Sequence, residues 1–122
     1  MRERTPAKIL RLHFSERDRY QGKPLHEAIV RKCRDMNLAG ATVFRGLEGY
    51  GETGEMHERH VAASDQPIIV VIVESAEKLT ACIPVFEQMM TTGVMAISDV
   101  EMIRVRREAT ETAHVPPNSY RQ

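Results

Sequence analysis

Six consecutive apolar residues at positions 68–73, with the sequence IIVVIV, decide the fold of this chain. The side chains of a β-strand point alternately to its two faces, so the even-numbered residues of this run share one face and the odd-numbered residues share the other. Keeping one Val or Ile from water contributes roughly 1.5–3 kcal/mol. The run therefore predicts a central strand that is covered on both faces.

The segment before this strand predicts a strand, a helix and a second strand. Residues 8–14, KILRLHF, alternate between apolar and polar side chains, as a half-buried strand does. Apolar residues recur at helical spacing over residues 25–37, with Pro24 as the first helical residue and Gly40 as a left-handed stop. Residues 41–45, ATVFR, predict the next strand.

The segment after the central strand predicts a helix and a final strand. Ser75 is the expected cap of a helix that continues to near Gly93 and is kinked at Pro84. Residues 100–107, VEMIRVRR, predict a strand that would carry Arg104 and Arg106 on the same face. The remaining residues, 107–122, are polar and are expected to form a flexible tail.

The resulting order, strand–helix–strand–strand–helix–strand, is typical of a ferredoxin-like α+β sandwich with a four-stranded antiparallel sheet. The 122 residues are expected to form a single domain with its core at about residues 8–106. Both helices would cover one face of the sheet. One of the two sets of side chains of the central strand would then meet water in a monomer, so we expect other subunits to cover that face.

The composition narrows the classes of function. Seventeen acidic and seventeen basic side chains balance to a net charge of zero, which argues against a nucleic-acid binder driven by bulk charge. The sequence has no apolar window of transmembrane length and no signal-peptide pattern, so we expect a soluble cytoplasmic protein. Cys33 and Cys82 fall on predicted helices, where reduced and buried thiols are expected.

Five of the seven glycines lie in one stretch, GATVFRGLEGYGETGEMHERH, at positions 40–60. Glycine packs no side chain and costs order in a strand, so a strand that needed only stability would avoid it. The stretch begins with strand-forming residues and ends in charge and histidine. Its glycines predict a segment that needs backbone freedom.

Four segments resemble the nitrogen-regulatory PII superfamily, and within it the domain-of-unknown-function family one-ninety. They are GATVFRGLEGYG at 40–51 with the long loop after it, MIRVRRE at 102–108, SERDRYQGKPLHEAIV at 15–30 and EKLTACIPVFEQMM at 77–90. The resemblance covers roughly residues 8–106. It implies a PII-like homotrimer of ferredoxin-like subunits whose bare sheet faces line the centre.

The resemblance also implies a ligand and a mode of action. PII proteins bind an adenine nucleotide in each cleft between subunits, and a long loop, here residues 49–66, responds to it and reaches a partner protein. By this resemblance the partner would be a membrane transporter, a channel or a metabolic enzyme. PII proteins carry a glycine- and lysine-rich phosphate loop where this chain reads TTGVMAISD, without lysine. AMP, ADP or a cyclic nucleotide is therefore as reasonable a ligand as ATP.

The resemblance assigns roles to individual residues of this chain by their positions in the matching segments. Thr42 matches a threonine near the adenine, and Arg104 and Arg106 match an arginine pair that contacts phosphate, for which a planar guanidinium is well suited. The predicted nucleotide-binding residues are Thr42, Arg45, Gly46, Gly49, Gly51, Arg104 and Arg106. The predicted partner-binding residues are Tyr50, Glu52, His57, Glu58 and His60.

Two alternatives stay open. A metal-binding trimer, like the copper-tolerance relatives that share the fold, would use His57, His60 or Cys33. A trimeric scaffold without a ligand would only display the loop. The sequence carries no nucleophile elbow, no G-x-x-x-x-G-K-[ST] loop and no dinucleotide fingerprint, so we expect no catalytic residues, no metal and no enzyme activity.

Overall fold

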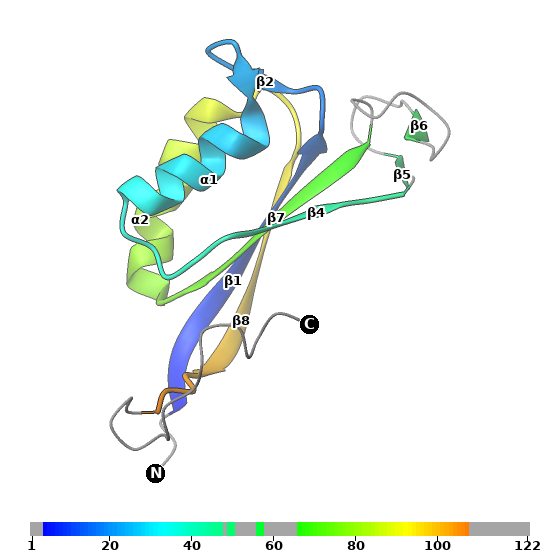
Figure 1. Cartoon of the computed structure of the whole chain (residues 1–122). Coiled ribbons are helices and arrows are strands. Elements are labelled where there is room, and N and C mark those ends of the chain that lie inside the picture. Colours follow the sequence, from blue (N-terminus) through cyan, green and yellow to red (C-terminus); the bar gives the residue numbers. More distant parts are fainter. Residues whose placement is uncertain (1–3, 48, 51–55, 58–65, 108–122) are drawn as a thin grey trace, which may run out of the picture.

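The computed structural model describes residues 4–47, 49–50, 56–57 and 66–107, and Figure 1 shows a sheet with both helices on one face. The sheet is antiparallel and has the strand order β4-β7-β1-β8. Its strands are β1 (Arg4–Ser15), β4 (Thr42–Arg45), β7 (Pro67–Glu74) and β8 (Val94–Ile103), and the helices are α1 (Leu25–Asp35) and α2 (Ala76–Met89). The predicted ferredoxin-like α+β fold is confirmed.

Four short strands form two small ladders outside the main sheet. They are β2 (Arg19–Tyr20) paired with β3 (Lys23–Pro24), and β5 (Gly49–Tyr50) paired with β6 (Met56–His57). The first ladder lies next to α1, as Figure 1 shows. The second ladder falls within the loop predicted between the second and third strands of the core. Among the described residues, no helix is both long and apolar enough to span a bilayer.

The helix-covered face of the sheet carries the hydrophobic core. Ile68, Val70 and Ile72 of β7 lie opposite even-numbered residues of β1, and all three are fully buried. The helices contribute the other side of this core with Leu25, Ile29 and Cys33 from α1 and Leu79, Cys82, Phe86 and Met89 from α2. One half of the IIVVIV run therefore packs under the helices as predicted, and the structure shows that it is the even-numbered half.

The opposite face of the sheet, called here the helix-free face, has no helix over it. The register places on it Ile9, Arg11 and His13 of β1, Ile69, Val71 and Val73 of β7, Thr42 and Phe44 of β4, and Val94, Ala96 and Ser98 of β8. The three β7 side chains are only half-buried in the single chain, and Phe44 is 54% exposed. Half of the apolar run thus still lacks the cover that its composition predicts.

Strands β1 and β8 continue beyond the rest of the sheet as a two-stranded arm. β7 pairs with β1 only as far as Lys8, whereas β8 pairs with it down to Arg4. Figure 1 shows this arm running past the ends of both helices. Ion pairs between Arg4 and Glu101 and between Lys8 and Asp99 link the two strands. The arm is therefore held by one backbone ladder and by ion pairs at its surface, without β7 beside it.

Two details of the first half differ from the sequence prediction. Pro24 is the cap residue rather than the first helical residue, since α1 begins at Leu25. The left-handed residue after α1 is Asn37, with φ 62°, and not Gly40. Asparagine is one of the few residues besides glycine that adopts this conformation readily.

The predicted boundaries of the second half also change. Ser75 caps α2 as expected, its Oγ accepting a bond from the Lys78 N–H at 3.3 Å. However, α2 ends at Met89, and β8 already begins at Val94. β8 ends at Ile103, opposite Arg4, so the prediction that Arg104 and Arg106 lie on the last strand was wrong.

Candidate functional site

Arg45 ends β4 at the base of the loop and is held by a carboxylate. Its Nε donates a hydrogen bond to Glu16 Oε1 at 2.9 Å, and Nη2 contacts Glu16 Oε2, so the pair is bidentate. The hydrogen bond to Glu16 raises the pKa of Arg45, and the negative charge of Glu16 adds to this effect. The Glu16 N–H also donates to the Gln66 carbonyl at 2.8 Å. Glu16 therefore contacts both sides of the loop base.

Gly46 follows Arg45 and lies very close to β7. Its N–H donates to the Pro67 carbonyl at 2.8 Å. A Cβ built on Gly46 would lie 2.7 Å from Pro67 Cγ, which is closer than real Cβ contacts come. Close packing against Pro67 is thus a sufficient reason for a glycine at this position.

Thr42 and Arg45 do not lie on the same side of the sheet. Thr42 is opposite Val71 on the helix-free face and is exposed. Arg45 is opposite Ile68, whose side chain lies on the helix-covered face. The structure therefore separates these two predicted nucleotide contacts across edge strand β4.

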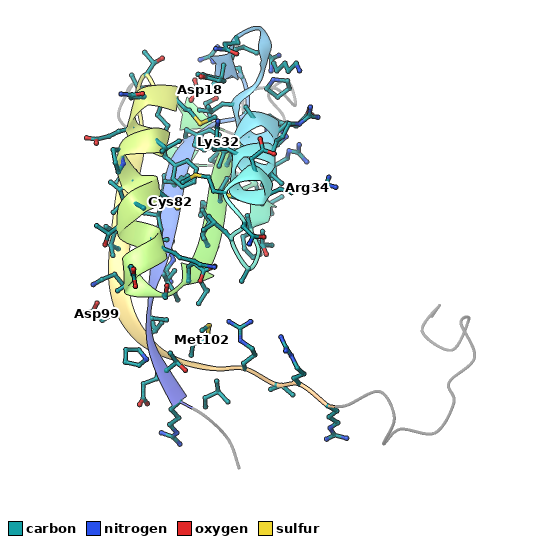
Figure 2. All side chains as sticks on the ribbon, turned by 90° about the vertical axis from the view of Figure 1, so that its left-hand side faces the viewer. Asp18, Lys32, Arg34, Cys82, Asp99 and Met102 are labelled. Carbon is teal, nitrogen blue, oxygen red and sulfur yellow. The ribbon has the colours of Figure 1, made fainter. Side chains whose placement is uncertain are left out.

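Arg104 and Arg106 follow the end of β8 and are both exposed. Arg104 Nη2 contacts Met102 Sδ at 4.0 Å. Within the described part of the chain, neither arginine forms an ion pair with a carboxylate. Figure 2 shows Met102 at the end of the sheet that the helices leave uncovered. Both guanidinium groups are thus available to an anion.

The loop base and the arginine pair lie at opposite ends of the sheet. Through Ile68, Arg45 aligns with Phe14 of β1, while Ile103 aligns with Arg4. Ten residues of β1 separate these two levels (14 minus 4), which corresponds to roughly 34 Å at about 3.4 Å per residue. The two groups cannot contact one small ligand within a single chain.

The remaining loop residues are placed only in part. In the ladder of β5 and β6, Gly49 pairs with His57 and Tyr50 pairs with Met56. Gly51, Glu52, Glu58 and His60 lie outside the described residues. No group of three His, Cys, Asp or Glu side chains suited to a metal occurs among the residues that are described.

The segment TTGVMAISD, expected at the position of a phosphate loop, belongs mostly to β8. The connection from α2 consists of Met90 to Gly93. Gly93 has φ 137°, and a Cβ there would lie 2.5 Å from the His13 carbonyl oxygen. A short connection packed this closely explains the glycine without any phosphate.

Glu74 is a buried carboxylate, 4% exposed, at the end of β7. It accepts hydrogen bonds from the Ala39 N–H at 2.7 Å and the Ser75 N–H at 3.0 Å. Burial alone would raise the pKa of Glu74. The bonds from Ser75 and Ala39, with the charges of Lys78 and Arg104, outweigh burial and lower the pKa. The carboxylate therefore ties the link before β4 to the sheet.

The two cysteines lie in the core between the helices and carry free thiols. Burial raises the pKa of Cys33 to about 11, and the neighbouring Cys82 adds to this shift. Burial also raises the pKa of Cys82. Both thiols are therefore held mainly in the protonated form, whereas the reactive form of cysteine is the thiolate.

Sequence reasoning missed Glu16 as the partner of Arg45 at the candidate site. It lies 29 positions before its partner Arg45, in a segment that reads only as a charged loop. No local pattern joins two residues at this separation. Their contact depends on the strand order of the sheet, in which only β7 lies between β1 and β4.

Comparison with solved structures defines the class of fold. A nitrogen regulatory PII-like protein, CPII from Thiomonas intermedia K12, bound to ADP, AMP and bicarbonate, superposes with a TM-score of 0.58 at 22% identity, covering 84% of this chain and 92% of that one. A Thermus thermophilus protein described as PII-like gives a TM-score of 0.63 at 15% identity, covering 83% and 93%. The fold is therefore that of PII-like proteins.

The family follows from the sequence itself. The model of the DUF190 family, described as "Uncharacterized ACR, COG1993", matches residues 7–102. A "UPF0166 protein" of Aquifex aeolicus (strain VF5) is 33% identical over 98 residues, which is 79% of this chain and 92% of that relative. The chain belongs to the DUF190 family.

Proposed function

We propose that this chain is a PII-like regulatory protein that binds a small adenine nucleotide between subunits and presents residues 49–66 to a partner protein. A single observation carries this proposal. Arg104 and Arg106 are exposed and form no ion pair within the described residues, and they lie roughly 34 Å along the sheet from Arg45 and Gly46. If both groups contact one ligand, they come from different copies of the chain.

The helix-free face supports assembly into a homotrimer. It is lined by Ile69, Val71 and Val73 together with the exposed Phe44 and Val94. Arg11 and His13 of β1 lie between the β7 residues and β8, but Phe44 lies directly opposite Ile69. Apolar side chains gathered on an uncovered sheet face mark an interaction site. Copies packed through it would cover the second half of the IIVVIV run. Subunits packed in this way would also bring the arm of one copy near a neighbour.

The ligand class rests on relatives and on chemistry. The CPII structure is bound to ADP, AMP and bicarbonate. In this chain, two arginines can each donate paired hydrogen bonds to phosphate oxygens. The described residues contain no glycine- and lysine-rich phosphate loop, since the corresponding connection is Met90 to Gly93. We therefore favour AMP or ADP over ATP.

The proposed action is regulatory and not catalytic, in the cytoplasm. The ligand would shift the population of loop conformations by binding one of them more tightly. Arg45 is the residue through which this would occur, because it begins the loop while its guanidinium is held by Glu16. A membrane transporter, a channel or a metabolic enzyme is the partner class that we propose.

Calorimetry with AMP, ADP, ATP and cyclic nucleotides tests the ligand. The double variant Arg104→Ala, Arg106→Ala is expected to lose binding. The double variant Arg19→Ala, Arg34→Ala removes the same charge from exposed positions on β2 and α1 and is expected to bind normally. At 100 times its dissociation constant, a nucleotide would stabilise the fold by roughly 2.7 kcal/mol. No binding of any nucleotide to the wild type would refute the proposal.

Mixing variants tests whether the site lies between copies. One variant carries Arg45→Ala, and the other carries Arg104→Ala with Arg106→Ala. Each alone is expected to bind weakly. After unfolding and refolding together, mixed trimers would contain clefts with both wild-type halves, so binding is expected to return in part. A mixture that binds no better than its components would contradict a site between copies.

A further inference from the structure

A hollow of about 190 Å³ lies between the β2–β3 hairpin and α1, with Met89 of α2 at its inner side. None of the predicted nucleotide-binding or partner-binding residues lines it. Figure 1 shows the hairpin beside the first turns of α1, on the helix side of the sheet. The hollow is therefore separate from the helix-free face and from the arm that leads to Arg104.

The floor of the hollow is apolar. Tyr20 and Ala28 are partly buried and pack against the hydrophobic core, and Met89 is 5% exposed. The Tyr20 hydroxyl accepts a hydrogen bond from Gln21 Nε2 at 3.3 Å. An aromatic ring beside a methionine offers a ligand an apolar contact below the charged rim.

The hairpin that forms one wall is fixed in place. Its turn residues, Gln21 and Gly22, have φ 51° and 80°, as in the two-residue turns that match strand twist. The Leu25 N–H donates to the Asp18 carbonyl at 2.8 Å, and Asp18 Oδ2 accepts from the Ser15 N–H at 3.0 Å. Since these bonds join the hairpin to β1 and α1, the hollow exists before any ligand arrives.

The rim carries ionisable groups of both signs. They are Lys23, Arg31 and Lys32, which are basic, and Glu27 and Asp35, which are acidic. Glu27, Arg31 and Asp35 follow one another at intervals of four on α1 and so share one side of the helix. Within the described part of the chain, none of the five side chains forms an ion pair or a hydrogen bond. Charges of both signs thus surround one small apolar floor and are available to a ligand.

We propose that this hollow binds a free α-amino acid. Its carboxylate would accept hydrogen bonds from the planar fork of Arg31, beside Lys32. Its ammonium group would donate to Glu27 or Asp35, and its side chain would contact Tyr20 and Met89. The hollow is smaller than the roughly 300–1,000 Å³ of pockets for drug-sized ligands, so it suits an amino acid and not a nucleotide.

Amide NMR spectra of the full-length protein, titrated with each of the common amino acids at millimolar concentration, test this proposal. Shifts are expected for amides of residues 20–35. Arg31→Ala is expected to weaken binding roughly tenfold or more, because it removes a hydrogen-bonded charge. Arg34→Ala is the matched control, since Arg34 is exposed on α1 but does not line the hollow. Figure 2 shows Lys32 and Arg34 on different sides of this helix.

Two single-charge probes separate a zwitterion site from a simple anion site. Acetate and ethylamine are each expected to bind much more weakly than the amino acid, and Glu27→Gln with Asp35→Asn is expected to remove the difference between acetate and amino acid. Acetate binding as tightly as every amino acid would overturn the proposal. So would the absence of shifts with all amino acids, or equal losses in the Arg31 and Arg34 variants. Nucleotide titration of the same samples reports on the proposed function independently.

Discussion

The two faces of β7 are equally apolar in sequence but differ in cover. Ile68, Val70 and Ile72 lie beneath the helices and are no more than 1% exposed. Ile69, Val71 and Val73 alternate with them, yet they remain half-buried on the helix-free face. Because both halves carry the same residue types, the sequence predicts burial on both faces of β7. Within the single chain, the helices cover only one of these faces. We propose that the second cover comes from another chain.

The largest effect that would test this contrast comes from shortening one side chain on each face. Ile72→Ala is expected to lower the free energy of unfolding by about 2–5 kcal/mol, because it leaves a cavity in a packed core. This loss should not change with protein concentration. Val71→Ala is expected to cost less, and its cost should grow with concentration as assembly covers the site. Urea unfolding at several concentrations measures both.

Equal, concentration-independent losses in these two variants would break the comparison. They would show that the helix-free face is satisfied within one chain. If only the loss in Ile72→Ala depended on protein concentration, the helix-covered face and not the helix-free face would be the one that assembly buries.

A smaller effect concerns the polar end of the covered face, where β7 ends in Glu74. Glu74→Gln is expected to cost about 1–2 kcal/mol at neutral pH, because two N–H groups lose a charged acceptor. The folded-state pKa of Glu74 lies below its ordinary value of 4.5. Its contribution to stability is therefore complete above that pH and is lost as the pH falls through the folded pKa.

Thermal unfolding across this acidic range measures the effect. The wild type should lose more stability on acidification than Glu74→Gln does. Glu87→Gln, at an exposed position of α2, serves as the control and should follow the wild type. Parallel curves for wild type and Glu74→Gln would mean that this carboxylate is not held by the bonds described.

The smallest effect is one of reactivity within the covered core. Cys33 and Cys82 are buried, and Cys33 has a pKa of about 11, so almost no thiolate is present at neutral pH. Both thiols should react with Ellman's reagent only after unfolding in urea. Fast reaction of either thiol in the native protein would show that the interface between α1 and α2 opens.

The fold could be predicted from the sequence because its signals are periodic. The IIVVIV run, the alternation over residues 8–14 and the Ser75 cap each specify an element through side chains that are neighbours in sequence. The ends of elements were less predictable. Asn37 takes the left-handed position expected for Gly40, and the pair Gln21 and Gly22 forms a hairpin turn inside an apparent charged loop.

The candidate site was predictable only as a set of residue types. Arg104 and Arg106 were predicted as phosphate contacts from the resemblance, but their distance from Arg45 follows from strand register, which no local pattern encodes. Glu16 was missed for the same reason. Gly46 was assigned to phosphate, whereas its closest neighbour is the ring of Pro67. Gly22 has open space around it and a positive φ, whereas Gly46 has a close neighbour, and only the structure distinguishes these two reasons for a glycine.

The arm formed by β1 and β8 should also open and close independently of the core. Beyond Lys8 it has neither β7 beside it nor a helix above it, so its amides depend on one ladder and on surface ion pairs such as Arg4–Glu101. Such a ribbon opens locally, without unfolding the core. Its amide hydrogens should exchange with solvent long before those of the helix-covered strands. Because Arg104 continues directly from this ribbon, binding of the proposed anion there would slow that exchange, and the exchange rate of the arm would then report whether the proposed site is occupied.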